Sequence, residues 1–307
     1  MEDKEITTVD ALKGILPALI TPFEEDGRVA TTSLERLLAR LFDAGVHGTY
    51  ICGTTGEGLL MSVEQRCRVA EIAVANTPPG HSAIVHVGAA SFEDARDLAT
   101  HAGRIGATAI SSLPPAGPGF GFPEARRYYA ALAAASPLPL VVYYFPEAYP
   151  AIRTLDHLEE ICALPNVAGV KFTDFDLSVL SAIAKPGRVV FNGRDEVLAA
   201  GLLMGAHGGI GSFYNLVPDQ FVDIDALARA GRWSEVRERQ DSVNALITAV
   251  LRFPLFPAIK QVLTWSGIPC GPCLVPRAGL SVEQQDALRK ALAAPQIRAV
   301  LPDEWTG

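Results

Sequence analysis

The chain has 307 residues, of which 49% are hydrophobic and 20% are charged, so it can bury a large core and is not a disordered linker or tail. Its 26 Lys and Arg residues against 34 Asp and Glu residues give a formal net charge of −8. An acidic chain lacks the basic surface that binds nucleic acid or anionic lipid, so we expect neither nucleic acid nor membrane as a partner.

Short apolar or β-branched runs alternate along the chain with longer segments whose apolar residues recur at i, i+3, i+4 and i+7. The short runs predict eight strands, and the longer segments predict helices between them. In chain order we expect strand 15–20, helix 32–44, strand 48–52, helix 62–75, strand 83–87, helix 91–103, strand 107–111, helix 123–135, strand 138–143, strand 167–171, helix 174–184, strand 189–192 and strand 208–212.

Two of these helices begin with the pattern of a capping box, a hydroxyl residue followed three positions later by Glu or Gln. The pairs are Thr32 with Glu35 and Ser62 with Gln65. In each pair we expect the hydroxyl to accept a hydrogen bond from a free backbone N–H group at the helix start.

Eight strand–helix units with near-continuous apolar strands favour an α/β fold, a closed (β/α)₈ TIM barrel. The alternative is an open doubly wound sheet, but the G-x-G-x-x-G pattern that such a sheet often carries is missing after the first strand. Further helical segments follow the eighth strand, at 221–230, 233–251, 258–265 and 281–293. We therefore expect a barrel domain over residues 1–230 that carries the active site, and a C-terminal helical extension over residues 231–307 packed on it.

In a TIM barrel the reactive groups lie at the carboxyl ends of the strands. The second strand ends in Cys52-Gly-Thr-Thr-Gly-Glu57, whose hydroxyls and exposed amides suit a small carboxylate or phosphate, although an ordinary turn is an equal alternative. The fifth strand ends near Tyr143, which can pass a proton or simply lie at the edge of the core.

The sixth strand carries Lys171 in an otherwise apolar run. An ammonium in the barrel interior is costly, so burial favours the neutral amine, and a neutral amine attacks a ketone to form a Schiff base. The alternative is a lysine that reaches solvent or pairs with a carboxylate. Strands seven and eight lead into the polar, Gly-rich segments 192–196 and 208–215.

Four motifs together resemble the N-acetylneuraminate lyase and dihydrodipicolinate synthase family of pyruvate-dependent class I aldolases, over about residues 14–290. They are Gly53-Thr-Thr-Gly-Glu57, Tyr143-x-x-Pro146, Gly169-Val-Lys171 and Gly209-Ile-Gly-Ser212. The resemblance implies that Lys171 forms the Schiff base with pyruvate and that Tyr143 shuttles the proton. It also implies that Thr54 and Thr55, in the turn that begins at Gly53, hold the pyruvate carboxylate.

Within the family the sequence is most similar to the N-acetylneuraminate lyase branch. Where the synthase branch has an arginine two residues after the strand-five proline, this chain has Ala148. The positions that match sugar-binding residues of the lyase branch are Thr173, Gly193, Asp195, Glu196 and Ser212. The Ser266-Gly-Ile-Pro-x-Gly-Pro272 segment is also similar to that branch, although we expect it to lie away from the chemistry.

The implied activity is cleavage or formation of a 2-keto-3-deoxy sugar acid with pyruvate as the keto fragment, without a metal or an organic cofactor. The alternatives are dihydrodipicolinate synthase activity, another 2-keto-3-deoxy acid aldolase or dehydratase, or a barrel that binds a keto acid without turnover. The resemblance implies a homotetramer.

Two features depart from the family pattern. The segment Pro114–Phe122 is rich in Gly and Pro where relatives have an aromatic pair, one member of which reaches a neighbouring subunit, so a dimer is the alternative to a tetramer. Arg194 and Tyr144 replace residues of other types, and we expect both to reshape the sugar end of the pocket.

The remaining signals predict no further chemistry. Cys270-Gly-Pro-Cys273 matches a redox dithiol motif but follows a helix instead of opening one, and His86 has no partner at metal-ligand spacing. Five scattered cysteines, no apolar run near the ~18 residues that span a bilayer, and no signal-peptide pattern in Met1–Ile6 predict reduced thiols and a cytoplasmic location.

Overall fold

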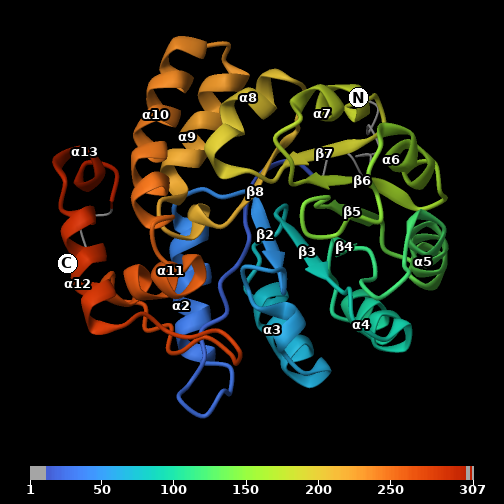
Figure 1. Ribbon diagram of the computed structural model, residues 1–307, viewed down its shortest axis with the longest axis horizontal. Coiled ribbons are helices and arrows are strands. Elements are labelled where there is room, and N and C mark those ends of the chain that lie inside the picture. Colours follow the sequence, from blue (N-terminus) through green and yellow to red (C-terminus); the bar gives the residue numbers. More distant parts are fainter. Residues whose placement is uncertain (1–11, 302–304, 306–307) are drawn as a thin grey trace.

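The computed structural model describes residues 12–301 and residue 305. Within them, eight parallel strands form one sheet in the order β1-β8-β7-β6-β5-β4-β3-β2. A parallel bridge between Ala18 and Tyr50 joins β1 to β2, so the sheet closes into a barrel (Figure 1). The predicted (β/α)₈ TIM barrel is confirmed, while the signal-peptide prediction for Met1–Ile6 falls outside the described residues.

All eight predicted strands are present, with ends shifted by up to a few residues. They are β1 (Gly14–Pro17), β2 (Gly48–Ile51), β3 (Ser82–His86), β4 (Ala109–Ser112), β5 (Leu140–Tyr144), β6 (Val167–Phe172), β7 (Val189–Asn192) and β8 (Gly208–Gly211). The helices around them are α2 (Thr31–Asp43), α3 (Val63–Ala75), α4 (Phe92–Arg104), α5 (Phe122–Ala135), α6 (Leu155–Cys162), α7 (Leu177–Ile183), α8 (Leu198–Leu203) and α9 (Pro218–Arg229).

One of the two predicted capping boxes is present. The Ser62 hydroxyl accepts from the Gln65 N–H group at 3.1 Å, and the Gln65 side chain accepts from the Ser62 N–H group at 2.9 Å. The prediction for Thr32 is wrong, because the N-cap of α2 is Ala30, two residues earlier, which has no side-chain oxygen to offer. The buried face of α2, with Leu34, Leu37, Leu38 and Leu41 in the core, stabilises this helix without a side-chain cap.

Alternation along the strands divides the core into two layers. The outer layer lies between the sheet and the helices. The inner layer fills the barrel with side chains that include Leu16, Tyr50, Ile84, Val141 and Phe191. The barrel is therefore a packed core whose chemistry is confined to its mouth.

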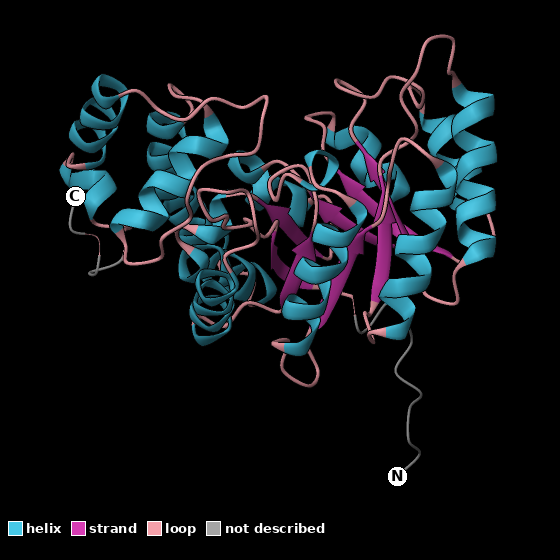
Figure 2. Ribbon diagram, turned by 90° about the horizontal axis from the view of Figure 1, so that it is seen from below, coloured by secondary structure: helices cyan, strands magenta, loops and turns pink. Residues whose placement is uncertain are grey.

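Beyond the barrel, the chain forms α10 (Trp233–Val250), α11 (Leu255–Trp265), α12 (Val282–Leu292) and α13 (Pro295–Arg298). These helices lie together on one flank of the barrel, as the side view also shows (Figure 2). The short helix α13 was not predicted from the sequence. Helix α10 packs against α9, the helix that directly precedes it. These contacts do not separate a barrel domain from a C-terminal extension, so the domain boundary at residue 230 stays a prediction.

The described residues contain no single helix that is both long and apolar enough to cross a membrane. Helices α10 and α11 reach the required length and apolar composition only when taken together, and the chain bends by 109° between them.

Candidate active site

The parallel register places a lysine beside a tyrosine at the barrel mouth. Tyr143 on β5 and Lys171 on β6 are register partners, so their side chains leave the sheet on the same face. Both residues are only 4% exposed. The Lys171 Nζ atom lies 3.9 Å from the centroid of the Tyr143 ring and 4.2 Å from that of Tyr50. The amine is therefore held in a largely dry pocket between two aromatic faces, not in bulk solvent.

Tyr50 on β2 is a residue of the site that was not predicted from the sequence. Its phenol donates a hydrogen bond to Ser111 Oγ at 3.0 Å, and burial raises its pKa well above the ordinary value. Tyr50 thus stays neutral and acts as a wall for Lys171. The alternation of side chains along β2, which directs Tyr50 into the barrel and its neighbours outward, could have predicted this position.

The turn after β2 presents two hydroxyls to the same mouth. The Thr55 Oγ1 atom lies 2.6 Å from the Oγ atom of Ser212, which directly follows β8. The Thr54 Oγ1 atom is buried and has no hydrogen-bond partner among the described residues. A buried hydroxyl without a partner is costly, and a bound acceptor such as a carboxylate would satisfy it. Gly53 does not line the pocket. It packs against the Tyr50 ring, where an added Cβ would be 2.6 Å away.

Asp195, at the start of a 3₁₀ turn after β7, is a buried carboxyl at the pocket edge. Its Oδ2 atom accepts a hydrogen bond from the Phe213 N–H group at 2.7 Å. Gly211 makes room for it, since a Cβ there would lie 2.2 Å from Asp195 Oδ1. Burial raises the pKa of Asp195 to about 7, so the carboxyl changes charge near neutral pH.

This pKa has a consequence for stability. The folded protein keeps Asp195 protonated up to about pH 7, whereas the unfolded chain ionises it near its ordinary value of 3.8. Between these values the folded state binds the extra proton, so the free energy of unfolding falls as pH rises, by up to about 4 kcal/mol. Asn cannot ionise, so Asp195→Asn is expected to raise the Tm, relative to wild type, more at pH 8 than at pH 5. Thermal melts at both pH values check this, and equal differences would contradict it.

These side chains surround one cavity of about 160 Å³. Every predicted site residue except Gly53 lines it: Thr54, Thr55, Tyr143, Lys171, Thr173, Gly193, Asp195, Glu196 and Ser212. Three further lining residues come from the C-terminal helices and their connection, namely Leu251, Leu255 and Phe256. No pattern in the sequence pointed to these three, because an apolar residue on a helix is equally typical of the core.

The two departures from the family pattern lie in different places. Arg194 lines the cavity, with its guanidinium 4.4 Å from the Phe175 ring centroid and one nitrogen 2.5 Å from Glu147 Oε2. Tyr144 does not line it, which corrects the expectation that it reshapes the pocket. It faces the outer layer and stacks on Phe172 with ring centroids 5.1 Å apart, because residues next to each other on a strand point to opposite faces.

The Gly- and Pro-rich segment 114–121 forms the connection between β4 and α5. No residue of this described segment lines the cavity, and Phe120 on it is exposed. The segment therefore contributes no wall to the lysine pocket.

His86 and the cysteine motif have structural surroundings. The His86 Nε2 atom accepts from the Leu113 N–H group at 3.1 Å, and burial lowers the pKa of His86 well below its ordinary value. Burial raises the pKa of Cys270 to about 12 and that of Cys273 to about 11. A redox dithiol needs a lowered pKa, so these thiols lack the activation that such chemistry requires.

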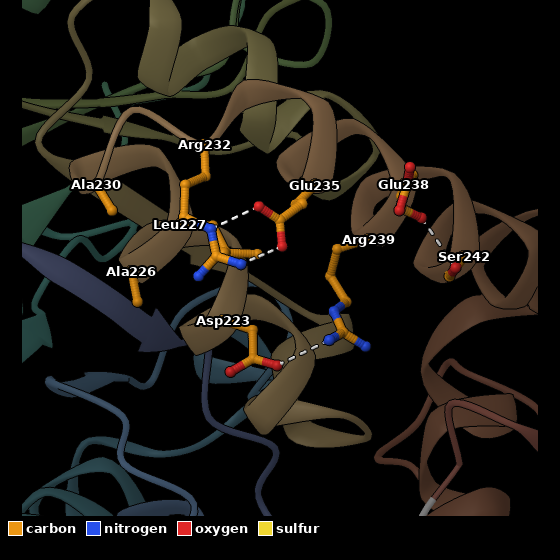
Figure 3. Close-up of a pocket in the computed structure, with 9 residues that line it drawn as sticks. All are labelled: Asp223, Ala226, Leu227, Ala230, Arg232, Glu235, Glu238, Arg239 and Ser242. Atoms are coloured by element: carbon orange, nitrogen blue, oxygen red, sulfur yellow. Dashed lines mark hydrogen bonds and ion pairs between the residues drawn. The ribbon is translucent and has the colours of Figure 1, made fainter.

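A larger hollow, of about 600 Å³, lies between α9 and α10 (Figure 3). Its charged side chains mostly pair with one another: Arg232 with Glu235, and Arg239 with Asp223 at 3.3 Å. None of the predicted site residues lines this hollow, and its side chains are held in exposed ion pairs of small energetic weight. The lysine pocket remains the candidate active site.

Comparison with known proteins identifies the family of this chain. The model of the dihydrodipicolinate synthetase family matches residues 11–295. An N-acetylneuraminate lyase of Rhizobium meliloti is 37% identical over 284 residues, which are 92% of this chain and 95% of that protein. The solved sialic acid aldolase of Ruminococcus gnavus has a TM-score of 0.89 at 27% identity, over 94% of this chain and 98% of the other.

The solved CdNal of Clostridium difficile, in complex with mannosamine, has a TM-score of 0.88 at 28% identity and covers 94% of this chain and 99% of its own. A lysine mutant described as catalytic has also been solved for the Ruminococcus gnavus aldolase. The chain therefore belongs to the dihydrodipicolinate synthetase family and is a lyase of the lysine-dependent, class I aldolase type.

Proposed function

We propose that this lyase cleaves a 2-keto-3-deoxy sugar acid of the N-acetylneuraminate type to pyruvate and an amino-sugar aldehyde. One observation carries the proposal: the Lys171 amine is buried 3.9 Å from the Tyr143 ring, in a cavity whose other walls offer unpartnered hydroxyls. A buried amine is a nucleophile, a phenol moves protons, and hydroxyls bind a carboxylate and a sugar chain.

In the first half of the proposed reaction, Thr54 and Thr55 hold the carboxylate of the keto acid, and the Lys171 amine attacks the C2 carbonyl carbon. The new C–N bond gives a carbinolamine, whose hydroxyl leaves as water after Tyr143 donates a proton to it. The products are a protonated imine on Lys171 and a Tyr143 phenolate. The positive imine is the electron sink for the next step.

In the second half, the Tyr143 phenolate takes the proton of the C4 hydroxyl as the C3–C4 bond breaks. The bond electrons pass into the imine, which becomes a neutral enamine, and the aldehyde leaves. Tyr143 then returns its proton to C3 of the enamine, which restores the protonated imine and leaves a phenolate. Water hydrolyses the imine to release pyruvate and the free Lys171 amine, and the proton set free in this step restores the Tyr143 phenol. Protons and electrons balance within this cycle.

The polar rim of the cavity supports a polyhydroxylated substrate. Thr173, Asp195, Glu196 and Ser212 place hydroxyl and carboxyl groups on the side of Lys171 toward β7 and β8. Several fixed donors and acceptors are what a sugar chain requires. The relatives named for N-acetylneuraminate and the neighbour in complex with mannosamine support the same class. The apolar Ala148 disfavours a synthase, which needs a cation there for a second carboxylate.

Two measurements test this proposal. A panel of keto-deoxy sugar acids is assayed for pyruvate release, and N-acetylneuraminate is expected to give the highest kcat/KM. Borohydride reduction with pyruvate is expected to leave a covalent adduct on Lys171, located by peptide mass mapping. A barrel that only binds keto acids would form no adduct and release no pyruvate, and this result would overturn the proposal.

Thr173 gives a prediction for the sugar end. Its Oγ1 atom is buried and has no partner among the described residues, and it lies so close to Gly193 that a Cβ there would be 2.2 Å away. Thr173→Val keeps the shape and removes the hydroxyl. We expect KM for the sugar acid to rise about 5- to 10-fold, the value of one hydrogen bond, while Tm does not fall. Steady-state kinetics with thermal melts check this, and an unchanged KM would contradict it.

A further inference from the structure

A buried ion pair lies directly behind the hydroxyl turn. The Glu57 side chain on the turn is 0% exposed and that of Lys260 on α11 is 3% exposed, and their Oε1 and Nζ atoms are 2.7 Å apart. Neither residue lines the lysine pocket. The pair therefore joins the barrel to the C-terminal helices without touching the cavity.

The segment after α11 satisfies the remaining atoms of the pair. Glu57 Oε2 accepts from the Leu274 N–H group at 2.9 Å and lies 3.4 Å from a nitrogen of Arg277. Lys260 Nζ donates to the Pro272 carbonyl oxygen at 2.8 Å. The pair is thus enclosed by Pro272, the last residue of the Ser266–Pro272 segment, and by Leu274 and Arg277, which follow it.

Each partner is tied to a different wall of the pocket. The Glu57 N–H group donates to the Thr54 carbonyl at 3.2 Å, and the Glu57 backbone has a φ of 60°, a left-handed conformation that costs energy outside glycine. On the other side, the first turn of α11 carries Leu255 and Phe256, which line the cavity. The ion pair holds the hydroxyl turn and this apolar wall at a fixed separation.

We infer that Glu57 and Lys260 are positioning residues, through which the C-terminal helices fix the turn that binds the pyruvate carboxylate. The inference rests on the proposed role of Thr54 and Thr55. Buried ion pairs contribute little net stability compared with apolar replacements, but they fix one arrangement of the groups around them. Loss of this pair shifts the threonine hydroxyls and weakens the binding of pyruvate. The Tyr143 phenol on β5 and the Lys171 amine on β6 keep their relative positions, because the two strands stay in register.

The main test is the double variant Glu57→Gln/Lys260→Met, which removes both charges and leaves no buried ion unpaired. Wild type and variant are incubated with increasing pyruvate, reduced with borohydride and measured by intact mass. We expect the pyruvate concentration for half-maximal trapping to rise at least tenfold, while full trapping is still reached at saturation. KM for the sugar acid is expected to rise in parallel, with kcat reduced less than threefold.

Arg277→Met is the matched control, because Arg277 is 27% exposed and contacts the same carboxylate at the longer distance of 3.4 Å. Its half-saturation is expected to stay within twofold of wild type. If the double variant does not fold, Glu57→Asp keeps the charge and shortens the side chain, and is expected to raise the half-saturation at least threefold.

A folded double variant, or a folded Glu57→Asp variant, with wild-type half-saturation overturns the inference and leaves the pair a structural element only. Failure of the proposed function looks different, because wild type itself would then show no trapping at any pyruvate concentration.

Discussion

Lys171→Ala is expected to lower kcat/KM for the sugar acid by about 10⁴-fold or more, since it removes the nucleophile on which every covalent step depends. Lys171 is the one lysine that lines the cavity among the described residues, so no neighbouring amine can replace it. The fold is expected to survive, because the change removes a buried amine without removing an ion-pair partner. Pyruvate release and borohydride trapping, both followed with the same enzyme preparation, measure the effect.

The control is Lys185→Ala. This lysine is 57% exposed and pairs with Glu159 on the outside of the barrel. Its removal is expected to leave both activity and trapping unchanged. Substantial pyruvate release by Lys171→Ala, or an adduct that maps to another lysine, would show that the imine mechanism assigned to Lys171 is wrong.

Tyr143→Phe is expected to lower kcat by about 10²- to 10⁴-fold, the usual contribution of a positioned acid–base group. The ring remains above the Lys171 amine, so the packing of the site is preserved. Pyruvate is still expected to be trapped on Lys171, although more slowly, because the variant keeps the nucleophilic amine. The separation of trapping from turnover distinguishes loss of the proton shuttle from loss of the pocket.

Tyr144→Phe is the matched control one residue along the chain. Its ring stacks on Phe172 in the outer layer, and it does not line the cavity. Activity within about twofold of wild type is expected, as for a change away from the site. A Tyr143→Phe enzyme with full kcat would contradict the proton-shuttle role.

The eight strands could be predicted because parallel strands buried on both faces are near-continuous apolar runs, and Lys171 stood out because it interrupts one of them. Capping was less predictable. Ser62 forms its capping box, whereas the N-cap of α2 is Ala30, two residues before the predicted Thr32. Local chemistry decides a helix end only where tertiary packing does not compete with it.

The missed parts of the site share one cause. Tyr50, Leu255 and Phe256 are apolar or aromatic residues whose sequence surroundings look like ordinary core, and only the closed barrel with its docked helices turns them toward Lys171. The prediction that Tyr144 reshapes the pocket was wrong for a different reason. It lies next to Tyr143, and the two-residue period of a strand sends it to the far face.

During translation, the ribosome completes Tyr143 and Lys171 long before it reaches Leu255 and Phe256. Of the residues that line the cavity, Leu251, Leu255 and Phe256 lie in this last part of the chain. One wall of the pocket is therefore added only after the helices that follow the barrel have been synthesised.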